Sequence, residues 1–215
     1  MHIAKGGVSW IITAFFLCII FGLLSLLSSN RIQQILFFST IVFGLLTVLF
    51  IVFFRDPNRL IGSGIVAVAD GTIRSVKSIE DEDVGSAWFI STFMNIYHVH
   101  VNRMPIEGTI QTITHITGSH LPAFTKESER NERVILLVKT KIGLVKIILI
   151  AGTLARRIVP YVKKGNKVKK GEKISLIRLG SRVDIYIPKK EQINIHVKEK
   201  DHMKAGGSMI ASPDV

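Results

Sequence analysis

Two long apolar runs near the N-terminus restrict what this chain can fold into more than any other feature. Val8–Leu27 and Ile35–Phe54 each contain 20 residues without a charged side chain. A helix of about 20 apolar residues spans the hydrocarbon core of a bilayer. The polar stretch Ser28–Gln34 is just long enough to join two such helices. Residues 1–54 are therefore predicted to form a transmembrane helical hairpin that anchors the rest of the chain.

Two other interpretations of the apolar runs remain. A secretory signal peptide is disfavoured, because the first run is too long and no small-residue cleavage site follows it. A pair of buried helices in a soluble protein would have the same length and hydropathy.

Charge is divided unevenly along the chain. Residues 1–54 hold no Asp or Glu and two basic residues, whereas residues 55–215 hold 26 Lys or Arg against 16 Asp or Glu. The basic residues that flank the apolar runs, Lys5, Arg55 and Arg59, place the domain on the cytoplasmic side of the cell membrane. A basic domain there is expected to meet anionic lipids. Nucleic acid is not the expected partner, because few aromatic residues accompany the lysines.

Residues 55–215 have the pattern of a mainly β domain. Short β-branched runs alternate with glycine-containing turns, and the one place for a helix is around Lys126–Arg130. The segments 161–174 and 196–209 repeat one pattern at an offset of 35 residues. This pattern resembles the hammerhead β-sandwich of biotinyl and lipoyl carrier domains. The displayed lysine of those carriers has no counterpart, so the resemblance concerns the fold alone.

A metal site is not predicted. His98 and His100 would share one face of a strand, but no third and fourth ligand follow at a recognisable spacing. Cys18, the only cysteine in the sequence, lies inside the first apolar run. A single cysteine excludes a disulfide within the chain and a zinc cluster made of cysteines. The histidine pair keeps two interpretations, a structural polar pair or acid–base chemistry near neutral pH.

Two further residues are ordinary turn residues when each is taken alone. Asp70 lies in VADGT, where Asp-Gly favours a turn, and Ser181 follows Gly180 in IRLGSRVDIYIP. Ser181 has neither a GxSxG context nor a Ser-x-x-Lys motif. Other stretches along the chain are needed to interpret both.

Six motifs occur in an informative order. They are FFRDPNR, VAVADGTI, HVHVNRMPIEG, NERV, IAGTLARRIV and IRLGSRVDIYIP. This order resembles the short form of phosphatidylserine decarboxylase, including the related archaetidylserine decarboxylases, over essentially the whole chain. HVNR-x-P-x-x-G and GSRVD are specific, whereas the Asp-Gly-Thr turn is not. The resemblance implies a lyase that decarboxylates the serine headgroup of an anionic membrane phospholipid to the ethanolamine lipid.

The resemblance also implies a proenzyme that makes its own pyruvate cofactor. Ser181 Oγ would attack the Gly180 carbonyl and convert the peptide bond to an ester. Elimination would then split the domain into a β chain, 1–180, and an α chain, 181–215. The former Ser181 becomes a covalent pyruvoyl group, which binds the substrate amine as a Schiff base before carbon dioxide leaves. Glycine at position 180 leaves its carbonyl open to approach, because it has no Cβ.

The resemblance assigns Asp70, a histidine and Ser181 to the group that performs self-cleavage. His100, in HVNR-x-P, matches the short-form pattern. His98 stands where short forms usually carry Asp, so His100 is favoured as the base. The residues leave open whether the substrate is a diacyl or an isoprenoid ether lipid.

The alternative function is non-enzymatic: a hammerhead adaptor or carrier domain anchored by the hairpin. Such a protein would remain a single intact chain. In either case a homo-oligomer is an expectation, because β-rich domains with exposed edges often pair.

Overall fold

The computed structural model describes residues 2–119, 131–152, 158–178 and 181–213. The chain divides into two compact units, Met1–Asn58 and Arg59–Val215. Gly180 and the expected helix around Lys126–Arg130 lie outside the described residues.

The first unit is a helical hairpin of α1 (Val8–Leu27) and α2 (Asn30–Phe53). The rings of Phe21 and Phe43 stack between the helices with centroids 5.3 Å apart. Both helices are long and apolar enough to cross a membrane, and few of their residues are buried. Exposed apolar side chains on both helices suggest that this unit associates with a membrane.

The second helix of the hairpin differs from the prediction at both ends, and it stops at Phe53, one residue before the predicted Phe54. The second helix begins at Asn30 instead of Ile35, because the polar residues before the apolar run continue the helix. The short strands β1 (His2–Ile3) and β2 (Arg55–Asp56) pair where the hairpin begins and ends.

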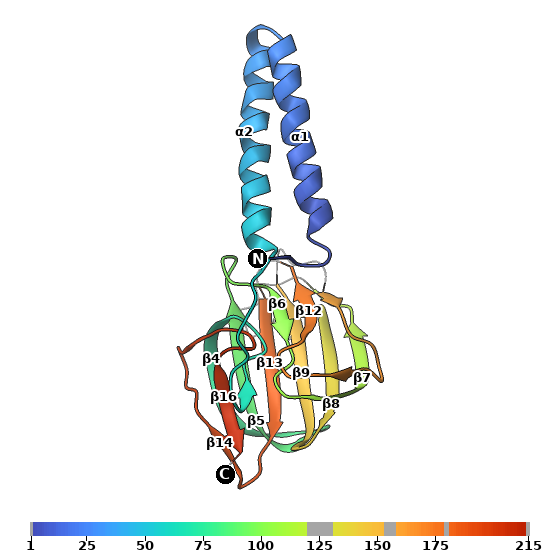
Figure 1. Cartoon of the computed structure of the whole chain (residues 1–215), viewed down its shortest axis with the longest axis vertical. Helices are drawn as coiled ribbons and strands as arrows, with labels where there is room; N and C mark the ends of the chain where they lie inside the picture. Colours follow the sequence, from blue (N-terminus) through green and yellow to red (C-terminus); the bar gives the residue numbers. More distant parts are fainter. Residues whose placement is uncertain (1, 120–130, 153–157, 179–180, 214–215) are drawn as a thin grey trace. The chain divides into compact units, whose positions relative to one another are not determined.

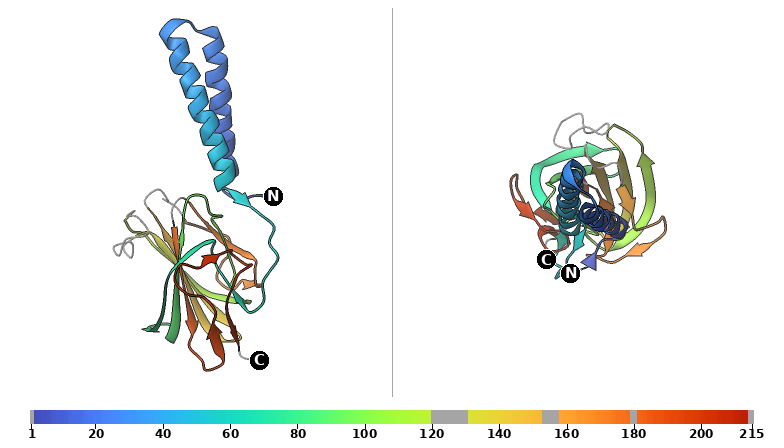
Figure 2. Two further views of the ribbon diagram at one scale, coloured as in Figure 1. Left: turned by 90° about the vertical axis from the view of Figure 1, so that its left-hand side faces the viewer. Right: turned by 90° about the horizontal axis from the view of Figure 1, so that it is seen from above.

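The second unit is mainly β, which confirms the predicted fold class. Its largest sheet has eight antiparallel strands in the order β11-β7-β8-β9-β13-β5-β4-β15 (Figure 1). Figure 2 shows that this sheet curls strongly. Two smaller sheets have the orders β10-β12-β6 and β14-β16-β3. The strands are β3 (Ile65–Val66), β4 (Gly71–Asp81), β5 (Gly85–Met94), β6 (Val101–Arg103), β7 (Gly108–Ile116), β8 (Arg133–Thr140), β9 (Gly143–Ala151), β10 (Ile158–Pro160), β11 (Lys167–Val168), β12 (Lys173–Ile177), β13 (Ser181–Pro188), β14 (Ile193–Ile195), β15 (His202–Met203) and β16 (Met209–Pro213).

The core lies on one face of the large sheet. Alternate residues of β13, Val183, Ile185 and Ile187, are buried on that face, as the two-residue period of a strand requires. They belong to the same hydrophobic cluster as Ile65 of β3 and Ile174 of β12. The two small sheets therefore cover this face of the large sheet.

An internal repeat relates the two halves of the domain. The large sheet has the same arrangement when it is followed inward from either edge. From one edge the strands are β11, β7, β8 and β9, and from the other edge their equivalents are β15, β4, β5 and β13. The same matching relates the two small sheets, because β10, β12 and β6 correspond to β14, β16 and β3. The sequence repeat of 161–174 and 196–209 is thus one part of a repeat that includes the whole domain.

Backbone hydrogen bonds recur at matching positions. In each matched pair of bonds, one partner residue has its equivalent 35 positions later in the sequence, and the other has its equivalent 37 positions earlier. The matched bonds are Gly171 N to Met104 O with Gly206 N to Ala67 O, and Ile110 N to Asn166 O with Ile73 N to Asp201 O. The β12–β6 and β16–β3 pairs also share an irregular register at matching positions, Lys173/Ser175 and Met209/Ala211.

One matched pair of turn residues gives a test of the repeat. Gly165 and Lys200 occupy equivalent turns with φ of +87° and +75°. A side chain costs about 1–2 kcal/mol in this left-handed region, and a Cβ on Gly165 would contact nothing within 4 Å. Gly165→Ala should therefore lower the free energy of unfolding by about 1 kcal/mol. Lys200→Gly should raise it by about 0.5 kcal/mol after the entropic cost of glycine. Urea unfolding of the full chain measures both, and a loss of stability in Lys200→Gly would contradict the matched turn geometry.

Candidate functional site

Ser181 begins β13 and is fully buried, with 0% of its surface exposed. It pairs with Met94 of β5 on one side and with Ala151 of β9 on the other. Strand alternation places its side chain on the same face as Val183, which is the face covered by the small sheets. Its Oγ has no hydrogen-bond partner among the residues that the structure describes. An unsatisfied buried hydroxyl is destabilising, and such exceptions often mark a reactive group.

Two residues that follow Ser181 in GSRVD, Arg182 and Asp184, form an ion pair on β13. Arg182 Nε and Nη2 donate hydrogen bonds to Asp184 Oδ2 at 3.1 and 2.9 Å, on the face opposite the core. Burial, together with the Asp184 carboxylate, raises the pKa of the neighbouring Tyr186 to about 12, so this phenol is neutral at physiological pH. The Arg and Asp of the motif thus bind each other, next to the predicted nucleophile.

The NERV motif forms hydrogen bonds to the end of β9, the strand beside Ser181. This role was not predicted from the sequence. Asn131 is fully buried, and its Nδ2 donates to Ala151 O at 2.8 Å. Ala151 N in turn donates to Glu132 O at 3.0 Å. Glu132 Oε1 lies 3.0 Å from Nε2 of His115. Two polar residues directly before an apolar strand were the only signal of this role.

The two predicted histidines have different surroundings. His100 is fully buried; its Nδ1 lies 2.8 Å from His98 O, and its own carbonyl accepts from Ile177 N at 3.2 Å. Ile177 ends β12, four residues before Ser181. His98 is half-buried and belongs to a turn, where its Nδ1 accepts a hydrogen bond from Asn95 N at 2.9 Å. Within the described part of the chain, no three His, Cys, Asp or Glu side chains come together as a metal cluster would require.

Asp70 is more than a turn residue. Its Oδ2 accepts from Arg59 Nη2 at 2.7 Å, and its Oδ1 accepts from Ala205 N at 2.7 Å. Both side chains of this ion pair are nearly buried, with 10% of Asp70 and 13% of Arg59 exposed. The carboxylate therefore has a fixed orientation directly before β4.

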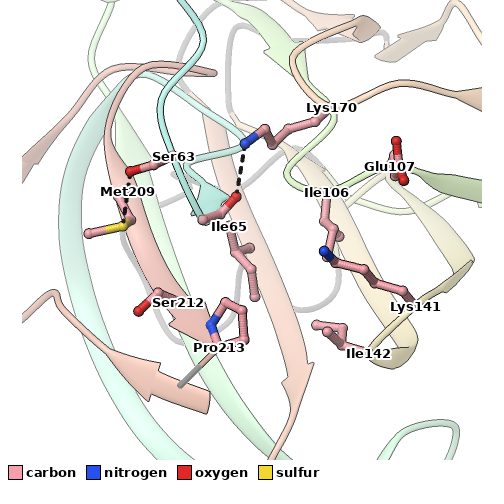
Figure 3. A pocket seen from close by; sticks show the side chains of 11 residues that line it. Ser63, Ile65, Ile106, Glu107, Lys141, Ile142, Lys170, Met209, Ser212 and Pro213 are labelled. Carbon is pink, nitrogen blue, oxygen red and sulfur yellow. Dashed lines mark hydrogen bonds between the residues drawn. The ribbon is translucent and has the colours of Figure 1, made fainter. Parts of the chain in front are cut away.

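A cavity of about 490 Å³ is lined by residues from both halves of the repeat (Figure 3). Ser63 and Glu107 line it together with Ile142, the residue directly before β9. Lys170 also lines the cavity, and its Nζ donates a hydrogen bond to Gly64 O at 3.2 Å. None of the predicted site residues lines this cavity.

The repeat nevertheless connects this cavity to the predicted site. At the offset of 37 residues, Glu107 corresponds to Asp70 and Ser63 corresponds to His100. The strand after the cavity, β9, corresponds to β13, which begins at Ser181. The repeat therefore predicts that Asp70, His100 and the first residue of β13 occupy the matching place.

Two repeat-related carboxylates give a matched test of the ion pair. Asp70→Asn removes the charge that Arg59 neutralises and should lower the free energy of unfolding by about 2 kcal/mol. Glu107→Gln, at the exposed equivalent position, should change it by less than about 0.5 kcal/mol. Urea unfolding of both variants checks this, and equal effects would show that the ion pair contributes nothing specific.

Comparison with known proteins agrees with the motif order. The family model described as phosphatidylserine decarboxylase matches residues 46–211. The chain is 39% identical over 212 residues to a protein of Methanococcoides burtonii named putative archaetidylserine decarboxylase proenzyme, covering 97% of this chain and 95% of that protein.

Bacterial relatives match a shorter part. A Streptomyces coelicolor protein named phosphatidylserine decarboxylase proenzyme is 46% identical over 149 residues, or 69% of this chain and 66% of that protein. A Thermobifida fusca protein of the same name is 51% identical over 137 residues, or 63% of this chain and 61% of that protein. With the family model matching most of the chain, this protein belongs to the phosphatidylserine decarboxylase family.

Proposed function

We propose that this protein decarboxylates the serine headgroup of a membrane phospholipid after cleaving itself between Gly180 and Ser181. The observation that carries the proposal is the buried Ser181 Oγ, which has no hydrogen-bond partner among the described residues. Relatives of this chain are named proenzymes. A buried hydroxyl at the start of the central strand is suited to act once, as the nucleophile of self-cleavage.

Self-cleavage needs a nucleophile and a base. Ser181 Oγ attacks the carbonyl carbon of Gly180, the C–N bond breaks, and the released amine stays on residue 181 as an ester forms. Loss of the Cα proton then expels the Gly180 carboxylate. The dehydrated residue 181 is hydrolysed with loss of ammonia. Residues 1–180 and 181–215 result as two chains.

His100 fits the role of base better than His98. A carbonyl oxygen only accepts hydrogen bonds, so His100 Nδ1, 2.8 Å from His98 O, carries the proton. The neutral imidazole then has its lone pair on Nε2, the atom that can accept a proton from Ser181. In His98, Nδ1 already accepts a backbone N–H within its turn.

Asp70 is proposed to position this group. Its support is the repeat, in which the residues equivalent to Asp70 and His100 line one cavity beside the strand equivalent to β13. The bond from Arg59 fixes the carboxylate, so its orientation does not depend on solvent.

The residues around position 181 fit a covalent pyruvoyl group. Strands β5 and β9 hold this position from both sides, at Met94 and Ala151. A pyruvoyl carbonyl there would supply the electron sink that a departing carboxylate requires. The chain would hold the reacting headgroup where water is excluded, because Ser181, Met94 and Ala151 are all fully buried.

The hairpin supports a membrane substrate and location. We propose that residues 1–54 anchor the decarboxylase domain, 55–215, to the cytoplasmic side of the membrane, in accord with the flanking basic residues. A domain held there meets phospholipid headgroups whose tails stay in the bilayer. Relatives named for phosphatidylserine and for archaetidylserine share the same headgroup.

Replacing the nucleophile tests the proposal directly. Ser181→Ala should give one folded 215-residue chain without decarboxylase activity, whereas the wild-type protein should give fragments of 180 and 35 residues. Ser181→Cys and Ser181→Thr should process slowly, because each retains a nucleophile. Mass spectrometry of the purified proteins and release of carbon dioxide from the lipid are the measurements. A wild-type protein that stays intact would instead favour a non-enzymatic hammerhead adaptor.

The two histidines can be separated by their effect on processing. His100→Gln should slow self-cleavage by about 100-fold or more, the typical contribution of a general base. His98→Gln should slow it far less, because it changes only a turn. Processing is followed by gel electrophoresis of the full chain after synthesis. A larger effect at His98 would reverse the assignment.

A further inference from the structure

An exposed apolar pair follows β5. Ile96 is 51% exposed and Tyr97 is 61% exposed. Exposing two adjacent large side chains to water is unfavourable, and such patches commonly mark interaction sites. Tyrosine is also one of the residues enriched where protein meets the membrane–water interface, because its ring is apolar and its hydroxyl is polar.

The turn that carries this pair is held by its own hydrogen bonds. His98 N donates to Asn95 O at 2.9 Å, and Asn95 N donates to His98 Nδ1 at 2.9 Å. Asn95 Nδ2 donates to the Tyr97 hydroxyl at 2.7 Å. The Tyr97 ring lies 4.6 Å from the His98 ring. The turn therefore presents Ile96 and Tyr97 outward in a fixed arrangement.

This turn lies at the same end of the sheet as Ser181. Met94, the last residue of β5, pairs directly with Ser181, and Asn95 follows it. The opposite end of β5 begins at Gly85, about 30 Å away at the rise of a strand.

Charge along the β4–β5 pair points the same way. Arg74 is exposed near the Ser181 end, with its guanidinium 5.4 Å from the Phe93 ring. The turn at the opposite end carries the exposed acidic residues Glu80 and Glu82, and Asp83 pairs there with Lys146 at 2.7 Å. An anionic lipid surface would attract Arg74 and repel Glu80 and Glu82.

We propose that the turn Asn95–His98 inserts Ile96 and Tyr97 into the lipid interface and so holds the end of the sheet where Ser181 lies against the bilayer. This inference rests on the proposed function for its purpose, but the membrane contact itself requires no catalysis. The hairpin keeps the domain near the membrane, whereas this turn gives the domain its orientation.

Fluorescent labels at the two ends of β5 test the contact. In the full chain with Cys18→Ser, an environment-sensitive fluorophore is attached to Ile96→Cys or, as the matched control, to Ser86→Cys. Both proteins are reconstituted into vesicles of phosphatidylcholine and phosphatidylglycerol. The label at position 96 should emit at shorter wavelength, resist quenching by aqueous iodide and be quenched by a nitroxide on the lipid. Equal iodide quenching at the two positions would overturn the proposal.

A double variant tests what the contact does. Ile96→Ser with Tyr97→Ser should lower turnover of a bilayer-embedded serine phospholipid about tenfold relative to turnover of a short-chain, water-soluble analogue. Equal losses on both substrates would indicate a structural role and overturn the orienting role. If the wild-type protein decarboxylates neither substrate, the proposed function fails, while the fluorescence result still decides the membrane contact.

Discussion

The pairing of β13 with both of its neighbours is the interaction on which the domain depends. β13 pairs with β9 over six residues and with β5 over eight, and Ser181 begins both ladders. The segment 181–213 then contributes four strands, β13 to β16, to the large sheet and to one small sheet. Cleavage before Ser181 would leave both ladders from Arg182 onward and the core contacts intact. The proposed α chain would therefore remain bound although its covalent link is lost.

The internal repeat explains how such a site can arise in a small domain. Each half supplies a matching turn, small sheet and central strand, so the fold forms two comparable places. One of them has Ser63, Glu107 and Gly143 where the other has His100, Asp70 and Ser181. The backbone frame is shared, and the side chains alone decide which place has the groups for chemistry, consistent with function being a property of sites and not of folds.

Much of this architecture could be predicted from local patterns. The apolar runs predicted both helices, alternation with glycine turns predicted a mainly β domain, and the motif order predicted the family. The full extent of the repeat was missed, because its offset varies between segments (37 residues from Asp70 to Glu107, 38 from Gly143 to Ser181 and 35 from Gly165 to Lys200) and few residues match. The roles of Asn131 and of the Arg59–Asp70 pair were also missed, since hydrogen bonds to distant residues leave no spacing in the sequence.

The sequence by itself determined the two helices and the fold class, and it predicted Ser181 as the nucleophile, because each of these depends on local composition or on a contiguous motif. Only the tertiary structure decided that Ser181 is buried between two strands, that His98 is held within a turn, and that Asp70 is fixed by Arg59. These properties depend on which distant segments pack together. Burial and hydrogen bonding, and not residue type alone, set what each of these side chains can do.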